Sequence, residues 1–392
     1  MSKRVGGFIN QDGLNAPDEP TSVSASAGDE EATVSFTAPS DVGGSAITGY
    51  VATSNDGIGA TGSSSPITVT GLTNDTAYTF RVWALNAFGY SAPSGASGSV
   101  TPSFQRAVFG GGEDSTGTNV MSYADIVTTG NAIDFGDLTQ GRAFLGAAAS
   151  STRGLFMGGV FDGVNNRNTI DYVTLNTPGN AVDFGDLTNT TSPSNNRAAC
   201  SSETRAVIGP GNMLYVTIAS TGNSVTFSTT FDFFYVAAAA SSTRGLFCAG
   251  QNGGTKSNTI NFVTIASTGT ITDFGDTTSA RVSLCGASNS TRAIFSGGET
   301  ASSRVNIMDY VTIASAGDAT DFGDLIAALD DVPSSAAGST RLLVGGGRTS
   351  GGGSNVIQYV TIASTGNAVD FGDLTLATYQ LSACSSAHGG LS

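Results

Sequence analysis

The feature that most constrains the fold is an internal repeat that fills the chain from about residue 104 onward. A unit of the form STRGLFMGG, then a Gly- and Asn-rich stretch, then IDYVTLNTPGNAVDFGDLT recurs six times. The units begin at Arg106, Arg153, Arg205, Arg244, Arg292 and Arg341. Their spacing varies between 39 residues (Arg205 to Arg244) and 52 residues (Arg153 to Arg205). A repeat of this length predicts an array of like supersecondary units, such as a propeller.

Each unit contains four strand-like pieces, which is the number that one propeller blade needs. In the second unit they are RAFLGAAAS from Arg142, RGLFMGG from Arg153, NTIDYVTLNT from Asn168 and AVDFGDLT from Ala181. This order resembles a kelch motif in which a phenylalanine replaces the usual closing tryptophan. The resemblance implies a six-bladed kelch-like β-propeller over residues 104–392.

The phase of the repeat predicts how the array ends. The first unit begins at its second strand, FQRAVFGGG, and the chain finishes with ATYQLSACSSAHGG, which is typical of a first strand. We therefore expect the strand near Tyr379 to Ser386 to pair with the three strands of residues 104–139, because this covers both exposed edges.

Residues 19–103 show a different pattern, with about seven short alternating strands separated by Gly, Asp and Asn turns. The run GLTNDTAYTFRVWALNAFGYSAPS resembles the E–F corner and F strand of a fibronectin type III domain. The resemblance implies a β-sandwich in which the Tyr78 hydroxyl bonds to backbone near the corner. Phe36 stands where this family often has tryptophan, so Trp83 either faces outward or belongs to a repacked core. Residues 1–18 lack a usable period and are expected to form an arm or linker.

Composition excludes several classes of function. The chain has 16 Lys and Arg against 31 Asp and Glu, a formal charge of −15, so we expect no nucleic-acid binding. Its single histidine, His388, excludes sites that need several imidazoles, and we interpret it as a structural loop residue. Four widely spaced cysteines predict buried free thiols rather than disulfides or a zinc site. No apolar run suits a signal peptide or a membrane span, so we expect no membrane insertion.

Two repeated motifs could be mistaken for catalytic chemistry. The kinase-like triplet DFG lies within DFGD at Asp134–Asp137, Asp183–Asp186, Asp273–Asp276, Asp321–Asp324 and Asp370–Asp373. Because it recurs in equivalent places, we interpret it as scaffold, with each Phe packed between blades and the aspartates bonded to turn backbone or to the repeated arginines. Calcium ligation by these turns is the alternative. The Gly-rich runs match no phosphate-binding loop. We predict no catalytic residues, no cofactor and no enzyme.

The long loops between the second and third strands differ from unit to unit, as an asymmetric binding surface requires. The predicted hydrogen-bond donors there are Asn165, Arg167, Lys256, Arg304 and Arg348, and Phe161 is the predicted stacking surface. Solvated loops with no binding role are the alternative. Lys3, Arg4, Phe8 and Ile9 of the N-terminal arm are predicted to dock on a partner protein.

The pairing of GGSAITGY…PITVTGLTNDTAYTF with YVTIASTGNAVDFGDLT is similar to bacteriophage virion proteins, especially those of phages that infect cyanobacteria. The resemblance implies a non-enzymatic tail, neck or head fibre or decoration protein that assembles in the host cytoplasm. Other virion proteins, further copies of the chain and a host-surface polysaccharide or receptor are the implied partners. A secreted or surface carbohydrate-binding protein of a bacterium is the alternative, and an intracellular kelch interaction protein is a third.

Overall fold

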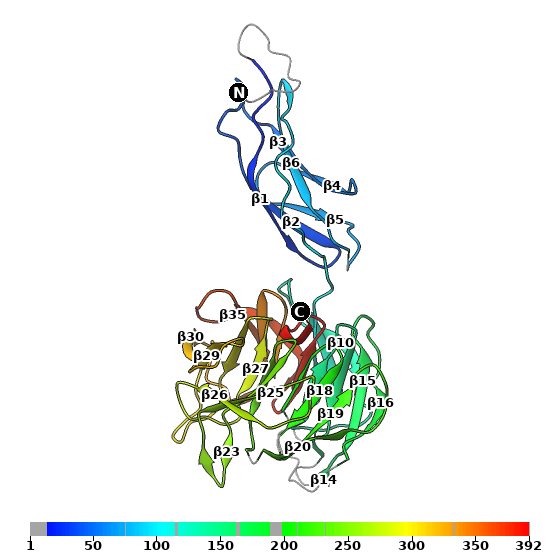
Figure 1. Ribbon diagram of the computed structural model, residues 1–392, viewed down its shortest axis with the longest axis vertical. Helices are drawn as coiled ribbons and strands as arrows, with labels where there is room; N and C mark the ends of the chain where they lie inside the picture. Colours follow the sequence, from blue (N-terminus) through cyan, green and yellow to red (C-terminus); the bar gives the residue numbers. More distant parts are fainter. Residues whose placement is uncertain are drawn as a thin grey trace. The chain divides into compact units, whose positions relative to one another are not determined.

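The computed structural model describes residues 14–74, 76–113, 117–161, 165–188, 198–209, 211–231, 233–331 and 334–391. These ranges contain β-strands and a single 3₁₀ turn, η1 (Gly389–Leu391), and no α-helix. The chain is therefore an all-β protein. It divides into two compact units after Phe104, and each unit is described separately (Figure 1).

The first unit consists of two antiparallel sheets, ordered β1-β2-β5 and β4-β3-β6-β7. Their strands are β1 (Thr21–Ala27), β2 (Glu31–Thr37), β3 (Gly49–Ser54), β4 (Gly59–Gly62), β5 (Ile67–Thr70), β6 (Phe80–Asn86) and β7 (Gly89–Tyr90). Alternate residues of β2, β3 and β6 are buried between the sheets, as the period of a half-buried strand requires. Phe36 and Tyr50 pack in this core with ring centroids 4.8 Å apart.

The corner before β6 confirms the prediction for the Tyr78 hydroxyl, and β6 itself shows which of the two predictions for Trp83 is correct. The Thr73 N–H donates to the Tyr78 hydroxyl at 3.0 Å, while the ring of Tyr78 is buried. Trp83 lies outside the core cluster and lines an outward-facing groove. The outward alternative is therefore correct.

A ladder of serines covers the free edge of β6. Ser91, Ser94 and Ser97 recur every third residue, and each bonds to one residue of β6 through both backbone and side chain. At Ser94, for example, the hydroxyl accepts from the Val82 N–H at 2.9 Å and the Ser94 N–H donates to the Val82 carbonyl at 2.9 Å. The edge is thus paired without a regular strand, which protects it from pairing with another chain.

The second unit contains five antiparallel sheets of four strands and one of five, which we number in chain order, together with two short two-stranded hairpins. Sheet 1 is β36 (Ser382–Ser385), β8 (Arg106–Gly110), β9 (Val120–Asp125) and β10 (Ile133–Asp137); sheet 2 is β11 (Gly146–Ala149), β12 (Arg153–Met157), β15 (Thr169–Thr174) and β16 (Val182–Asp186); sheet 3 is β17 (Ala198–Ser201), β18 (Arg205–Gly209), β19 (Gly211–Thr217) and β20 (Val225–Phe231). Sheet 4 is β21 (Ala237–Ala240), β22 (Arg244–Cys248), β25 (Thr259–Thr264) and β26 (Thr272–Asp276); sheet 5 is β27 (Cys285–Ser288), β28 (Arg292–Ser296), β29 (Ile307–Thr312) and β30 (Thr320–Asp324); sheet 6 is β31 (Ser334–Ala337), β32 (Arg341–Gly345), β34 (Gly352–Thr361) and β35 (Val369–Thr378), with β33 (Arg348–Thr349) paired to β34.

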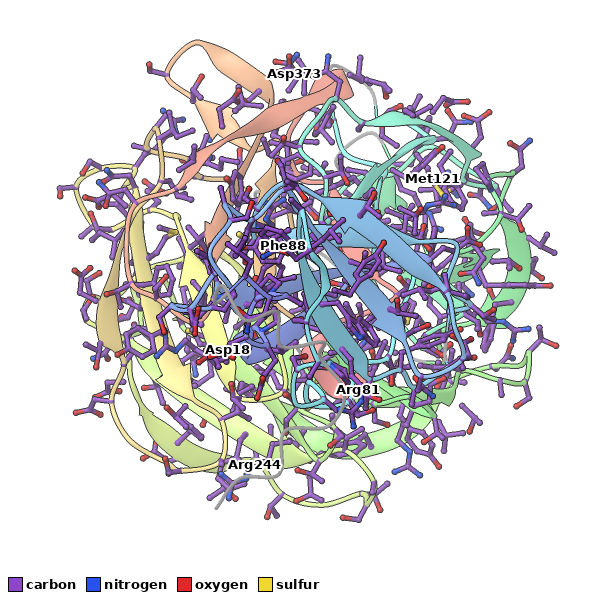
Figure 2. The ribbon with its side chains drawn as sticks, turned by 90° about the horizontal axis from the view of Figure 1, so that it is seen from above. Asp18, Arg81, Phe88, Met121, Arg244 and Asp373 are labelled. Atoms are coloured by element: carbon purple, nitrogen blue, oxygen red, sulfur yellow. The ribbon has the colours of Figure 1, made fainter. Side chains whose placement is uncertain are left out.

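The first strands of these sheets contact one another in the order β11, β17, β21, β27, β31, β36 and again β11. Met121 of sheet 1, Arg244 of sheet 4 and Asp373 of sheet 6 accordingly lie in different sectors of the unit in Figure 2. Strand β36 pairs with β8, with Cys384 opposite Val108. The predicted pairing of the C-terminal strand with the first unit of the repeat is confirmed.

The six repeated arginines join neighbouring sheets. Each guanidinium lies over an aromatic ring of its own sheet, at 4.1 Å for Arg106 over Tyr123 and up to 4.9 Å for Arg244 over Phe262. It also donates to a backbone carbonyl just beyond the third strand of the next sheet. The acceptors are those of Leu175, Ile218, Ile265, Ile313, Ile362 and, for Arg341 of the last sheet, Val127 of the first.

The DFGD motifs form a second set of junctions. Phe135 is buried, and its carbonyl accepts from the Gly179 N–H of the next sheet at 2.7 Å. Gly136 (φ 132°) forms a bulge there, where a Cβ would approach the Gly179 carbonyl to 2.6 Å. The same pair of contacts recurs from Phe371 to Gly130, which links the last sheet to the first. The predicted packing of the Phe residues is therefore confirmed.

The predicted pairing of the DFGD carboxylates with the arginines is wrong for the described residues. The arginines point to aromatic rings and carbonyls instead, and none of the ion pairs in the described ranges includes a DFGD aspartate. The buried ion pairs are Arg142–Asp171 and Arg281–Asp309, whose side chains are fully inaccessible. Each ties the segment before a first strand to the third strand of the same sheet.

Candidate functional site

The loops between second and third strands carry the residues predicted from sequence. Hairpin β13 (Val160–Phe161) and β14 (Asn165–Asn166) holds two of them, and β23 (Gln251–Asn252) with β24 (Thr255–Lys256) holds a third. The Arg167 guanidinium lies 5.4 Å from the centroid of the Phe161 ring, so these two residues contact each other. The side chain of Asn165 lies outside the described residues, as do residues 1–13 of the N-terminal arm, which include Lys3, Arg4, Phe8 and Ile9.

The other three predicted donors are already engaged within the chain. Lys256 Nζ lies 3.4 Å from Glu299 Oε2 and donates to the Thr300 carbonyl at 2.6 Å. Arg304 Nε lies 2.7 Å from Asp330 Oδ1. These contacts join the loop of one sheet to the next sheet.

Arg348 makes the most extensive of these contacts. Its Nη2 lies 2.9 Å from Asp331 Oδ2, its Nε lies 3.4 Å from Asp330 Oδ1, and its guanidinium lies 5.8 Å from the Tyr379 ring. A guanidinium that is paired in this way must break internal contacts before it can bind a ligand. Lys256 and Arg304 therefore stabilise junctions between sheets, and Arg348 ties its loop to the segment before β31 of its own sheet. All three offer less free surface than their sequence suggests.

A second group of residues lies just before the first strands of the sheets, next to the start of the long loops. Phe144, Tyr235, Ser283, Asp331 and Gln380 each follow the residue that bridges to the start of a long loop, as in Ala143 to Val160 and Asp330 to Arg348. We call these five residues the axial cluster. All five have positive φ, between 54° and 60°, a conformation that is uncommon for any residue except glycine.

The axial cluster is connected by backbone hydrogen bonds between sheets. The Phe144 N–H donates to the Gln380 carbonyl at 2.9 Å, and the Gln380 N–H donates to the Asp331 carbonyl at 2.8 Å. The Ser283 N–H donates to the Tyr235 carbonyl at 3.1 Å, and the Phe144 and Tyr235 rings meet edge to face with centroids 6.5 Å apart. The five residues therefore form a continuous series of contacts that crosses five sheets.

The polar part of the axial cluster is poorly solvated. Burial raises the pKa of Asp331, while the neighbouring Arg348 and a hydrogen bond from Gln380 act in the opposite direction. Gln380 is 6% exposed, and its Oε1 has no hydrogen-bond donor within the described part of the chain. The Phe144 and Tyr235 rings of the same cluster are half-buried. An unpaired acceptor and aromatic rings in one cluster match a ligand that offers a hydroxyl or amide N–H and an apolar face.

A cavity of about 60 Å³ lies directly behind the axial cluster, between the first strands. Leu145, Val236, Leu284 and Leu381, each of which follows a cluster residue, form its wall together with Ser334. This volume is too small for an organic ligand, so binding would take place at the cluster and not inside the cavity.

His388 closes the opposite end of the first strands. The imidazole Nε2 lies 2.9 Å from the Ala149 carbonyl, and the Gly390 N–H donates to Nδ1 at 3.1 Å. Burial lowers the pKa of His388, so the ring is neutral and donates through Nε2. A structural role is thus sufficient to explain this residue.

The cysteines lie in the core of the second unit. All four cysteines are buried and free, and burial raises the pKa of Cys200, Cys285 and Cys384 to about 12. Within the described ranges, no three His, Cys, Asp or Glu side chains are placed to hold a metal ion. No helix in the same ranges is long and apolar enough to cross a membrane.

The axial cluster was not predicted from the sequence, although a signal for it is present. It occupies the second position in AFLG, FYVA, VSLC and YQLS, directly before a leucine or valine, and the residue there changes from unit to unit. Variation in the long loops is easier to recognise, because a single variable position beside a strand looks like scaffold.

Comparison with known proteins gives a result for the first unit. The fibronectin type III domain family matches residues 18–99. No curated protein matches the chain. Among solved structures, the crystal structure of domains A168–A170 from titin is 31% identical, with a TM-score of 0.21. That match covers 22% of this chain and 32% of the titin chain, so this chain spans about a third of the titin structure.

Proposed function

Residues 18–99 form a fibronectin type III domain, and from this premise we propose that the chain is a non-enzymatic structural and adhesion protein of a virion. In this proposal the second unit is a six-bladed kelch-like β-propeller that presents a binding face, and the sandwich serves as its spacer. The resemblance to phage fibre and decoration proteins motivates the virion assignment.

The proposed propeller is supported by contacts between neighbouring sheets that form a cycle, in which the last sheet contacts the first. The first strands contact one another in a circular order, and the Arg341 and Phe371 junctions join sheet 6 to sheet 1. Strand β36, which follows sheet 6 in the chain, completes sheet 1. Each of these contacts is expected for a ring that closes on itself.

The observation that carries the binding proposal is the variation within the axial cluster. Five sheets place five different residues in one uncommon backbone conformation, and only Asp331 is of a type, glycine, asparagine or aspartate, that tolerates it. A scaffold position under selection for stability alone would use those residues. The face is therefore proposed to bind a host-surface polysaccharide or receptor through the cluster, with the long loops around it.

The test replaces the two aromatic cluster residues without stressing the backbone. Asparagine tolerates positive φ, so Phe144→Asn with Tyr235→Asn removes the rings and keeps the conformation. We expect adsorption to host cells to be lost while the melting temperature is unchanged. Val182→Ala, at an exposed position of β16 in the same sheet as Phe144, is the control and should adsorb normally. Normal adsorption by the double variant would reject the cluster as the binding site.

The rest of the assignment follows from the same resemblance. The arm is proposed to attach the protein to other virion proteins, and several copies are proposed to assemble in each particle. The second candidate is a secreted or surface carbohydrate-binding protein of a bacterium, which the unpaired Gln380 acceptor and the aromatic rings of the same cluster also suit. Copurification with assembled particles supports the first candidate, and its failure favours the second.

A further inference from the structure

The segment that follows β36 lies against the first strands of several sheets. We call residues 386–391 the strap, which ends with the turn η1. Near its start, the Ser386 hydroxyl accepts from the Arg106 N–H of sheet 1 at 3.0 Å. At its end, η1 contacts β17, β21 and β27, which are the first strands of sheets 3, 4 and 5. The strap therefore joins sheet 1 to three further sheets.

Two glycines allow η1 to fit closely against these strands. Gly389 and Gly390 are both buried. A Cβ at Gly390 would overlap the Ser201 carbonyl oxygen, and a Cβ at Gly389 would overlap the Asn289 carbonyl oxygen. A side chain at either position would therefore keep the turn from its present place.

His388 fixes the strap through both of its ring nitrogens. Nε2 lies 2.9 Å from the Ala149 carbonyl oxygen, which can only accept, so Nε2 carries a proton. Nδ1 lies 3.1 Å from the Gly390 N–H, which can only donate, so Nδ1 carries none. Both hydrogen bonds therefore exist only while the imidazole is neutral and protonated at Nε2.

A second proton on the ring is incompatible with this arrangement. It binds to Nδ1, where it faces the Gly390 N–H, so that two donors point at each other. The buried Gly390 N–H then loses its acceptor, which is costly. The cationic ring would also lie against a cavity of about 50 Å³ whose wall consists mainly of alanines of the first strands. Protonation therefore favours a state in which the ring and η1 are hydrated.

The strands around the imidazole offer no charge that would offset this cost. The first strands β11, β17, β21 and β27, all within the described ranges, contain no Asp, Glu, Lys or Arg. The titratable groups of these strands and of β36 are the thiols of Cys200, Cys285 and Cys384. Burial raises the pKa of each thiol to about 12, so all three stay neutral.

The charged groups of the adjoining turns are engaged elsewhere. The Glu203 carboxylate, after β17, accepts from the Ser151 N–H at 2.9 Å and from its hydroxyl at 2.8 Å. The arginines that begin the second strands lie over aromatic rings of the third strands; they are Arg153, Arg205, Arg244 and Arg292. Glu203 raises the pKa of His388, but burial lowers it by more. The released strap therefore binds the proton more tightly than the docked strap.

From this geometry we propose that His388 is a pH-sensitive switch that releases the strap from the first strands in mildly acidic solution and opens the cavity beneath it to solvent. Strand β36 keeps its four-residue pairing with β8, so the change is confined to the strap. The proposal concerns the second unit by itself and does not depend on the proposed virion function.

The test is hydrogen exchange of the strap, measured by mass spectrometry at pH 7 and pH 5. Exchange is expressed as a protection factor, which removes the pH dependence of the chemical exchange step. Protection of the strap should fall by up to about 25-fold, because each opening takes up one proton with the usual histidine pKa of about 6.5. Protection of β22 in the same unit should stay constant. His388 is the only histidine, so its single imidazole NMR signal should change over the same pH range.

Two variants separate the proton from the fit of the turn. His388→Gln cannot take up the proton, so protection of the strap should no longer depend on pH. Gly390→Ala prevents docking, so protection should be low at both pH values and His388 should titrate near its usual pKa of about 6.5. Gly366→Ala is the matched control, because no atom lies within 4 Å of a Cβ at that position, and it should behave like the unmodified protein.

Three results would overturn the proposal. Equal protection of the strap at pH 7 and pH 5 in the unmodified protein would show that protonation does not release it. An equal fall in His388→Gln would assign the effect to another group, such as Glu203. A fall that β22 shares would show that the whole unit opens, and not the strap alone.

Discussion

The packing between sheets makes a sharp prediction at Gly245. This residue lies on β22 of sheet 4 and faces Cys200 on β17 of sheet 3, and a Cβ at Gly245 would lie 2.4 Å from Cys200 Sγ. The equivalent pair between sheets 2 and 3 is Ala148 with Ala206, which pack in one buried cluster. Cys200 therefore faces a glycine between sheets 3 and 4, whereas two alanines occupy the same positions between sheets 2 and 3.

The expected energies follow from this complementarity. Gly245→Ala forces the Cys200 thiol or the backbone to move, and overpacking of this kind costs about 1–3 kcal/mol. Cys200→Ala alone removes one buried sulfur and leaves a small cavity, at a cost of about 1–2 kcal/mol. The double variant recreates the Ala148 and Ala206 pair, so its free energy of unfolding should lie within about 1 kcal/mol of the unmodified protein.

The assay is urea unfolding followed by circular dichroism, with Trp83 fluorescence reporting the first unit separately. Gly269→Ala is the matched control, because no atom lies within 4 Å of a Cβ at that glycine of the same repeat. The control should be neutral or slightly stabilising. If the two core substitutions were additive, so that Gly245→Ala cost as much in the Cys200→Ala background as in the unmodified protein, the steric reasoning would be refuted.

Three further predictions test other parts of the fold. Burial lowers the pKa of His388 below its usual 6.5, so the unfolded chain takes up the proton first as the pH falls. The free energy of unfolding should therefore decrease as the pH drops below about 6.5, and this pH dependence should vanish in His388→Gln. Ser94→Ala leaves the buried Val82 N–H without its side-chain acceptor and should cost about 1–3 kcal/mol, read as an earlier transition in Trp83 fluorescence, whereas the exposed Ser63→Ala should cost nothing measurable. Arg341→Met removes the junction between sheets 6 and 1 and should cost about 2 kcal/mol in thermal unfolding followed by circular dichroism, while Lys256→Met, on a half-exposed loop pair, should cost less than about 1 kcal/mol.

Sequence alone could predict the order of strands and the pairing of β36 with β8. The repeat fixed the number of sheets, and its phase showed which strand was missing from the first. Tyr78 was predictable because its partner lies five residues away in the chain, within one turn. Local pattern and repetition carry that kind of information directly.

Contacts between sheets were harder to predict from the sequence. Lys256 finds Glu299 and Arg304 finds Asp330 because neighbouring sheets face each other in one register, which the repeat of a single unit does not specify. Likewise, the arginines were one of two predicted partners of the DFGD carboxylates, although their own sheets offer an aromatic ring at 4.1–4.9 Å. The axial cluster was missed because positive φ at Phe144 or Tyr235 leaves no mark in residue type.

The pairing of β36 with β8 has a consequence during synthesis. Strand β8 ends at Gly110 and its partner begins at Ser382, 272 positions later. At about 5–20 residues per second, the ribosome needs roughly 14–54 seconds to deliver that partner. Throughout this interval the first sheet of the second unit keeps one edge open, whereas each later sheet receives all of its strands from one continuous stretch of chain. The first sheet to emerge is therefore the last to be completed. On an mRNA that carries many ribosomes, its open edge is available to the C-terminal strand of a neighbouring chain.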